Sequence, residues 1–315
     1  MNCLVTGIAG FAGSHLAKRL VEEGHKVVGI AMPGESLRRL QPLGSAVETR
    51  FADITDAKSL AGALEGIEAD CAFHLAAVAS VPAAFAAPEM AFRVNTLGTV
   101  NLLEAMRPAR LKRFLYISSA DVYGHVAPET LPLRETQALR PASPYSASKA
   151  ASEIIALQYW RAYALPVVIL RPFNHTGPGQ GFGFAPSDFA GAIARIERGL
   201  TMPRLAVGNL ESYRDFTDVR DMVRAYALAA KLCEAGEVYN ISSGRSVRTG
   251  DVLKMLLSFS TARIEVVGDP ARQRPSDTPV VTGDHSKFSA RTLWQPEIPF
   301  EKTLRDLLDS YRTGV

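Results

Sequence analysis

The first half of the chain alternates short apolar runs with longer amphipathic stretches, and this alternation constrains the fold more than any other feature. The short apolar runs predict strands at 2–6, 26–30, 46–51, 70–76, 113–118 and 166–171. The stretches between them carry apolar residues at helical spacing, at 12–24, 56–66, 88–106 and 145–164. Continuous apolar strands that alternate with helices indicate a parallel sheet covered on both faces. The predicted fold class is therefore α/β, with a doubly wound parallel sheet.

The pattern changes after Arg171. Residues 172–187 are too rich in Gly and Pro for a helix or a central strand, and such a long loop after a parallel strand is more often a ligand loop than a linker. The predicted elements beyond it are helices near 188–199, up to about 233, near 249–258 and near 300–312, and a strand at 237–242. We predict a first domain over 1–171, rejoined by about 215–242. A smaller, partly interleaved C-terminal lobe is predicted over 172–214 and 243–315.

Composition excludes several classes of protein. A net charge of +3 on 315 residues gives no general case for binding nucleic acid or a membrane surface. Cys3, Cys71 and Cys233 form no CxxC pair and no metal spacing, and the six histidines show no HxH or HExxH pattern, so no metal is expected. No signal peptide and no apolar run near the ~18 residues of a membrane span are found. We expect a soluble, cytoplasmic protein.

A glycine-rich turn follows the first predicted strand directly. The sequence TGIAGFAG places Gly7, Gly10 and Gly13 between that strand and the first helix. Gly7 would permit the tight turn, Gly10 the close approach of the backbone to a pyrophosphate, and Gly13 the close packing of helix on strand. The phosphates would then lie at the helix N-terminus. The position of this G-x-x-G-x-x-G segment favours a Rossmann dinucleotide site over a plain tight turn.

The end of the second predicted strand bears on the choice between NAD and NADP. NAD sites usually place an acidic residue there to bind the adenosine ribose, and this chain has Ala31. A 2′-phosphate is then not repelled, and Ser36, Arg38 or Arg39 could meet it, although the arginines could equally form a solvated helix face. The balance favours NADP, with NAD left open. Asp53, after the third strand, could accept from the adenine amino group or cap a helix.

Tyr145 and Lys149 lie four residues apart at the start of a predicted helix, so both project from one face. A nearby ammonium lowers the pKa of a phenol from about 10, and such a Tyr can act as an acid or a base on an alcohol or carbonyl oxygen. Ser118 and Ser119 follow the fifth strand, at the sheet edge where ligands bind in such folds. We predict that the Tyr, the Lys and one serine form a proton-transfer site beside a nicotinamide.

With these motifs the chain resembles the extended short-chain dehydrogenase/reductase family, the NAD-dependent epimerases, dehydratases and reductases of nucleotide sugars. The resemblance covers essentially the whole chain and rests on TGIAGFAG, ADITD, FHLAA, VNTLGTVNLLEA, SSADVYG, YSASK, RPFNHTGPGQ and RDFTDVRDM. It implies a catalytic triad of Ser119, Tyr145 and Lys149, and a supporting role for Asn95 at the cofactor site. The cofactor-binding residues that it implies are Gly7, Gly10, Phe11, Ala12, Gly13, Asp53, Ile54, Leu75, Ala76, Ala77, Tyr145 and Lys149.

Within that family, the segments at 173–190, 207–226 and 274–279 are most similar to reductases that convert GDP-4-keto-6-deoxymannose to GDP-rhamnose with NAD(P)H. Two arginines could clamp a diphosphate, because a guanidinium binds phosphate in a bidentate manner. The competing interpretation for Arg214 is an ion-pair network with Asp215 and Asp218. Asp188 could accept from guanine or cap a helix. The implied substrate-binding residues are Ser119, Asp121, Asn174, Asp188, Arg214 and Arg274.

Other functions are weighed against the reductase. A 4-epimerase would use the same triad, and Ala31 counts mildly against it because epimerases keep NAD bound. A 4,6-dehydratase would need an acid/base pair where this chain has Ala120 and Asp121, which disfavours elimination. A redox-sensing or scaffold protein without chemistry is disfavoured because the triad is intact. The partners that the resemblance implies are a GDP-linked nucleotide sugar and a second copy of the chain, through helices near 90–107 and 145–163.

Overall fold

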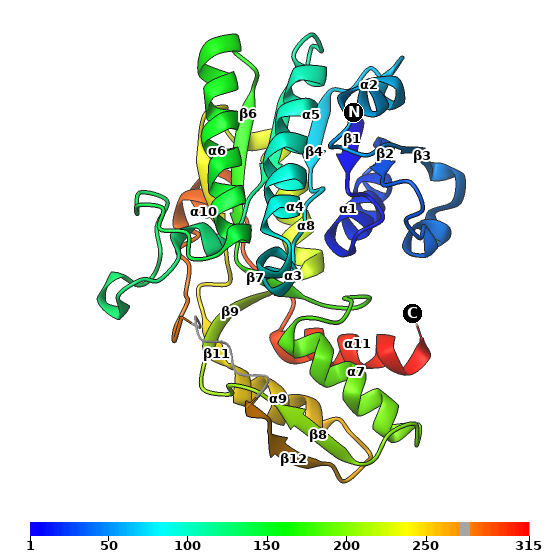
Figure 1. Ribbon diagram of the computed structural model, residues 1–315, viewed down its shortest axis with the longest axis vertical. Helices are drawn as coiled ribbons and strands as arrows, with labels where there is room; N and C mark the ends of the chain where they lie inside the picture. Colours follow the sequence, from blue (N-terminus) through cyan, green and yellow to red (C-terminus); the bar gives the residue numbers. More distant parts are fainter. Residues whose placement is uncertain (271–277, 315) are drawn as a thin grey trace.

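The computed structural model describes residues 1–270 and 278–314. Its centre is a seven-stranded sheet in the order β10-β6-β5-β4-β1-β2-β3, and every neighbouring pair in it is parallel (Figure 1). The strands are β1 (Asn2–Thr6), β2 (Lys26–Ala31), β3 (Val47–Phe51), β4 (Cys71–His74), β5 (Arg113–Ile117), β6 (Val167–Pro172) and β10 (Val238–Ile241). The predicted doubly wound α/β fold is confirmed.

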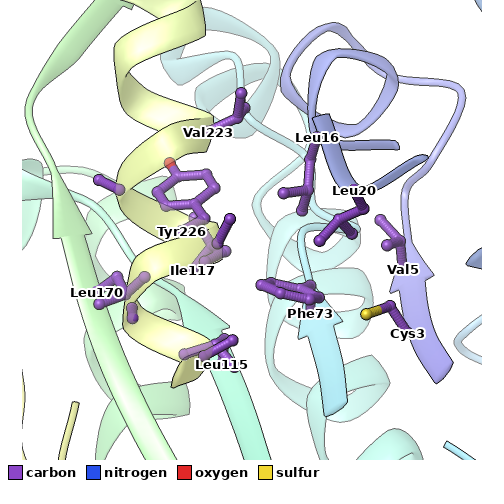
Figure 2. Close-up of a cluster of buried hydrophobic side chains, with 14 of the residues drawn as sticks. Cys3, Val5, Leu16, Leu20, Phe73, Leu115, Ile117, Leu170, Val223 and Tyr226 are labelled. Atoms are coloured by element: carbon purple, nitrogen blue, oxygen red, sulfur yellow. The ribbon is translucent and has the colours of Figure 1, made fainter. Parts of the chain in front are cut away.

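Helices cover both faces of this sheet because its strands are apolar on both sides. One face packs against α1 (Phe11–Glu22), α8 (Val219–Leu232) and α10 (Ser286–Thr292). Figure 2 shows part of that core, with side chains of α1 and α8 meeting those of β1, β4, β5 and β6. The other face packs against α2 (Ala57–Leu64), α5 (Gly98–Met106) and α6 (Pro144–Tyr163). The two cores hold the strand ends in fixed positions.

The predicted helix at 88–106 is divided in the structure. It consists of α4 (Pro88–Phe92), a π-helical turn at Arg93–Leu97, and α5. A short helix, α3 (Val81–Ala86), precedes it, with Ser80 as its N-cap. The π turn carries buried Asn95, whose side chain contacts α6 and the loop after β4. Local widening of a helix at such a residue is common near functional sites.

A smaller lobe lies at one end of the sheet (Figure 1). It contains a three-stranded sheet of β11 (Ser246–Arg248), β9 (Tyr213–Asp218) and β7 (Asn174–Thr176), and a pair formed by β8 (Arg204–Val207) and β12 (Glu265–Gly268). Its core lies among α7 (Ala185–Glu197), α9 (Thr249–Ser258) and α11 (Phe300–Thr313). Short 3₁₀ segments complete the chain at Arg38–Ala46, Ala120–Tyr123 and Pro128–Thr130.

The chain crosses between the two parts several times. Helix α8 and strand β10 return to the large sheet after the chain has built β7, α7, β8 and β9. The predicted domain boundary at 171, with the chain rejoining the first domain at about 215–242, stays a prediction. The described contacts do not assign a ligand to either part. None of the described helices has the length and apolar character needed to cross a membrane.

Candidate active site

A cavity of about 1180 Å³ lies where the carboxyl ends of the parallel strands face the smaller lobe. Its walls include residues that directly follow β1, β3, β4, β5 and β6, together with the end of β2. The smaller lobe contributes residues of β7, the loop after it, and β9. This is the edge of a doubly wound sheet at which ligands bind, and the cavity has walls from both parts of the molecule.

The turn after β1 is shaped by three glycines. Gly7 has φ +67°, and a Cβ there would lie 2.8 Å from the Ala76 nitrogen. A Cβ on Gly13 would lie 2.1 Å from the Gly7 oxygen, so only glycine lets α1 approach β1 this closely. Gly10 is the N-cap of α1, without a side chain to cap the helix. The first N–H groups of α1 therefore adjoin the cavity, and such a cradle fits a pyrophosphate.

The structure brings the predicted cofactor residues to the wall of this one cavity. Asn95 stands behind them, since its Oδ1 accepts from Val78 N at 2.7 Å and its Nδ2 donates to Ser148 Oγ at 2.9 Å. It thereby joins the loop after β4 to helix α6. The predicted residues that line the cavity are Gly7, Gly10, Phe11, Ala12, Gly13, Asp53, Ile54, Leu75, Ala76, Ala77, Tyr145 and Lys149.

In the loop after β2, the two arginines that could have met a 2′-phosphate bind backbone carbonyls instead. Arg38 donates to the Gly314 carbonyl, and Arg39 donates to the Gly179 carbonyl at 3.0 Å. Neither arginine is among the described residues that line the cavity, whereas Met32, Pro33, Gly34 and Glu35 are. The Glu35 carboxylate accepts from Met32 N at 3.2 Å, and this hydrogen bond places the carboxylate at the end of β2. Sequence reasoning missed Glu35, although its place four residues beyond Ala31 was a usable signal.

Asp53 also lines the cavity, and the capping alternative for it is wrong. Its Oδ1 accepts from the Thr55 nitrogen and hydroxyl, both at 2.8 Å. The N-cap of α2 is Asp56, whose side chain accepts from Lys58 N and Ser59 N. Asp53 therefore shapes the turn after β3 and keeps its second oxygen for other contacts.

Helix α6 presents the predicted Tyr–Lys pair on one face. Ser143 starts the helix with a capping box formed with Ser146, and Pro144 occupies its first position. Tyr145 and Lys149 follow on successive turns, and both line the cavity. The Lys149 side chain is buried, and its ammonium donates to the carbonyl of Ile117, the last residue of β5. This hydrogen bond holds the ammonium at the end of β5, directly before the two serines.

The two serines after β5 have different environments. The Ser118 hydroxyl donates to buried Glu153 on α6. The Ser119 hydroxyl accepts from Asp121 N at 3.1 Å and caps the following 3₁₀ turn. The Ser119 hydroxyl also lies close enough to the Tyr145 phenol to lower its pKa, an effect that favours the phenolate. Both serines line the cavity, but Ser119 is the one beside the phenol.

Burial sets the pKa values of the two ionisable groups. The Tyr145 side chain is only partly buried, yet loss of solvation raises its pKa well above the usual range; the nearby charge of Asp121 adds to this shift and Ser119 opposes it. Burial lowers the pKa of Lys149 to about 7, and the carboxylate of Glu153 opposes that shift. The expectation of a lowered pKa for Tyr145 is therefore wrong. At neutral pH the phenol is protonated, and it can act first as a proton donor.

A buried ion pair lies one helical turn beyond Lys149. Glu153 follows Lys149 by one turn on the same face of α6, and its carboxylate accepts from Arg171 of β6 at 2.7 Å. Arg171 also donates to the Tyr123 hydroxyl at 2.9 Å, and Tyr123 donates to Asn240. These side chains are buried, and removing one partner of such a pair is strongly destabilising.

The predicted substrate residues are only partly brought together. Asp121, Asn174 and Arg214 line the cavity with Ser119. Arg214 donates to the carbonyls of Tyr213 and Thr278, at 2.8 and 2.7 Å. Arg274 lies outside the described residues.

The neighbours of Arg214 have their own partners. Asp218 pairs with Arg220 at 2.7 Å, and buried Asp215 accepts from Ser243 and from backbone N–H groups of two glycines. Asp188 lies in the first turn of α7, where it accepts from Gly183 N at 2.8 Å. It is not among the described residues that line the cavity, and it is not the N-cap of α7 either, since that position is Phe184, whose side chain makes no capping hydrogen bond.

Several other lining residues were not singled out from the sequence. Arg93 comes from the π turn, and Phe182 and Phe184 come from the loop before α7. Tyr226 comes from α8, on the face of the sheet that α1 covers. A helical pattern shows which residues are apolar but not which of them reaches a cavity. In residues 1–270 and 278–314, no cluster of three or more His, Cys, Asp or Glu side chains could hold a metal ion.

Comparison with known proteins agrees with this geometry. The family described as GDP-mannose 4,6 dehydratase matches residues 4–307. A GDP-6-deoxy-D-mannose reductase from Pseudomonas aeruginosa is 36% identical over 99% of this chain and 97% of its own length. The structure of RMD from Pseudomonas aeruginosa complexed with NADPH has a TM-score of 0.88 and 34% identity, covering 100% of both chains. The structure of a UDP-glucose 4-epimerase from Thermus thermophilus in complex with NAD has a TM-score of 0.89 and 32% identity, again over 100% of both chains.

Proposed function

The chain belongs to the GDP-mannose 4,6-dehydratase family, within the extended short-chain dehydrogenases/reductases, and from this we propose that it reduces the C4 carbonyl of a nucleotide-linked 4-keto-6-deoxy sugar. It is an NAD(P)-dependent nucleotide-sugar oxidoreductase, and its cofactor is NADP or NAD. The observation that carries the proposal is the meeting of Ser119, Tyr145 and Lys149 at one cavity with a glycine cradle. The proposed substrate is GDP-4-keto-6-deoxymannose, and the product is GDP-rhamnose.

In the proposed mechanism, residues of the chain protonate and hydrogen-bond the carbonyl oxygen of the substrate. NAD(P)H, when bound, supplies the hydride that C4 accepts. Tyr145 donates its phenolic proton to the oxygen, so that hydride and proton together add two hydrogens. Ser119 donates a hydrogen bond to the same oxygen while negative charge develops on it. Lys149, when it is charged, would favour departure of the proton from the phenol. The raised pKa of Tyr145 keeps the phenol protonated at neutral pH, so the proton is available, while its transfer depends on Ser119 and Lys149 to offset the raised pKa.

The smaller lobe is proposed to hold the nucleotide sugar. Asn174 and Arg214 face the cavity from β7 and β9 and would bind the diphosphate or the sugar. Arg274 keeps its proposed role as a second clamp on the diphosphate. Nothing at the cavity wall supports guanine recognition by Asp188, because this residue is not among the described residues that line the cavity. The choice of GDP therefore rests on the reductase from Pseudomonas aeruginosa, not on a residue of the cavity.

A 4-epimerase is the second candidate. It would use the same three residues, and the structural likeness to an epimerase bound to NAD supports it. A 4,6-dehydratase is less favoured because Ala120 stands in the cavity wall beside Asp121, without the second acid/base group that elimination needs.

The assembly and location of the protein are also proposed. Large apolar side chains are exposed on α3, α4 and α6, which favours a homodimer through this layer: Phe85, Met90, Phe92 and Ile154. All three cysteines are buried and free, which suits a reducing cytoplasm. We therefore propose a cytoplasmic homodimer.

The assay that tests the proposal is nicotinamide absorbance with GDP-4-keto-6-deoxymannose and NADPH or NADH. We expect oxidation of the reductant and a product heavier by two hydrogens. Tyr145→Phe should reduce turnover by at least about a hundredfold, the usual worth of a general acid, while leaving cofactor affinity nearly unchanged. An unchanged-mass isomer formed from GDP- or UDP-sugars without reductant would identify an epimerase instead, and loss of water would identify a dehydratase.

A further inference from the structure

A buried hydroxyl at the cavity wall is not used by the triad. Tyr226 of α8 is 0% exposed, and its hydroxyl has no hydrogen-bond partner among the residues that the structure describes. The same side chain lines the cavity. A buried phenol that makes no hydrogen bond is costly, and phenylalanine would fill the same space without that cost. The position therefore points to a polar group that enters the cavity and meets this oxygen.

The place of Tyr226 in the fold indicates which ligand it meets. Figure 2 shows it projecting from α8 beside Ile117 and Leu170, with its hydroxyl at the end away from Leu115. Ile117 ends β5, so the hydroxyl points toward the strand ends and the serines that follow. Helix α8 packs directly on α1, whose N-terminus adjoins the glycine cradle. Tyr226 thus belongs to the cofactor side of the cavity.

The opposite side of the cavity already carries the triad. Tyr145 and Lys149 come from α6, on the other face of the sheet. A negative charge on Tyr145 would raise the pKa of Tyr226, which is the behaviour of two phenols that face a common space. The nicotinamide ring would lie between these two helices, at the end of β5. Its one polar substituent is a carboxamide, which both donates and accepts hydrogen bonds, as a phenol does.

We propose that the Tyr226 hydroxyl binds the carboxamide of the nicotinamide ring and fixes the orientation of that ring in the cavity. This inference rests on the dinucleotide site of the proposed function and does not depend on the identity of the sugar. Tyr226 is a positioning residue, since it holds the ring while Tyr145 handles the proton. The hydroxyl is retained at a cost to the folded protein because it serves the bound cofactor.

Tyr226→Phe should have two effects of opposite sign. The protein without cofactor should melt at a higher temperature, because an unsatisfied buried hydroxyl is removed. The dissociation constant for NADH or NADPH, measured by calorimetry, should rise about tenfold, the change that one lost hydrogen bond to a ligand produces. ADP-ribose lacks the nicotinamide ring, and its affinity should stay unchanged.

Tyr116→Phe is the matched control. Tyr116 of β5 is a second fully buried tyrosine, but it does not appear among the described residues of the cavity wall. Its substitution should leave both affinities as they were. Unchanged NADH affinity in Tyr226→Phe, or an equal loss for NADH and ADP-ribose, would overturn the inference. A wild-type protein that binds none of the three ligands would overturn the dinucleotide site itself.

Discussion

At the scale of single residues, burial separates the two ionisable groups of the candidate site. Tyr145 is held protonated, and Lys149 has a pKa of about 7, because the charged form of each is poorly solvated. Glu153 counteracts the shift of Lys149 from one helical turn away. Two groups whose pKa values are pushed in opposite directions by one environment are the usual sign of an acid/base pair.

The pKa of Lys149 leads to a pH prediction. The proposed mechanism uses the ammonium of Lys149, which is charged below about pH 7 and neutral above it. The kcat/KM for reduction should therefore fall as pH rises through about 7, since this parameter reports the free enzyme. Glu153→Gln removes the negative charge that supports the ammonium, so the fall should move to lower pH. Circular dichroism would establish that the variant is folded, and a profile independent of pH between about 6 and about 8 would contradict the assignment.

Glu35 is the basis of a second prediction, on the preference between NADH and NADPH. Its carboxylate lies at the end of β2, in the cavity wall, while Arg38 and Arg39 hold backbone carbonyls elsewhere. A carboxylate there binds a ribose diol and repels a 2′-phosphate. Wild-type protein should bind NADH more tightly than NADPH, the reverse of the balance suggested by Ala31 alone.

Glu35→Gln should shift the ratio of the two dissociation constants toward NADPH by about fivefold, because one charge near the surface is worth about 1 kcal/mol. Titration of each reduced cofactor, followed by its fluorescence, gives the ratio. Glu22→Gln, at the far end of α1, is the control and should leave it unchanged. If Glu35→Gln leaves the ratio of the two dissociation constants unchanged, the carboxylate serves only the turn that it closes with Met32.

At the scale of elements, the sequence was sufficient for the large sheet. Strands such as 113–118 and 166–171 are apolar on both faces, and helices such as 145–164 show helical spacing with capping residues at their start. These signals are local and strong. The positions of the glycine turn, of Tyr145 with Lys149, and of Ser119 after β5 followed from them. Their arrival at one cavity follows from the parallel order of the strands.

The short elements could not be predicted in the same way. Strands β7, β8, β11 and β12 have only three or four residues, and they are stabilised by partners far away in sequence. Helix α7 begins at Ala185, inside the stretch expected to be a loop, because Pro186 suits the first turn of a helix. The roles of Glu35 and Asp188 depend on side-chain direction, which a single sequence does not reveal.

At the scale of the whole molecule, the loop at 177–183 connects the lobe to the large sheet. His15 on α1 meets the Pro178 carbonyl at 2.9 Å, and Arg39 donates to the Gly179 carbonyl at 3.0 Å. From the lobe, Tyr311 of α11 donates to the Gln180 carbonyl at 2.6 Å. The cavity wall is thus continuous across the two parts, which lets a cofactor and a sugar nucleotide share one space.

The exposed apolar layer predicts how two such molecules associate. Ile154 on α6 is 63% exposed, and Phe85, Met90 and Phe92 on the neighbouring α3 and α4 are exposed beside it. Helix α6 contacts both α3 and α4, so these exposed side chains lie on one layer of helices, and Met90 also lines the cavity. Exposed apolar side chains gathered on one layer are the basis of the proposed interface, and a twofold dimer would cover them with the same layer of the partner.

Ile154→Glu should therefore convert a dimer into a monomer, because a twofold axis places two added charges in one apolar interface. Analytical ultracentrifugation at several concentrations measures the change, with an expected increase of at least about a hundredfold in the dimer dissociation constant. Met202→Glu is the control, since Met202 is 83% exposed in the smaller lobe, away from this surface. A wild-type protein that sediments as a monomer, or an Ile154→Glu variant that stays dimeric, would place the interface elsewhere or remove it. Because Tyr145 and Lys149 lie on the inner face of the same helix, the monomeric variant should also show whether the dimer supports the active site.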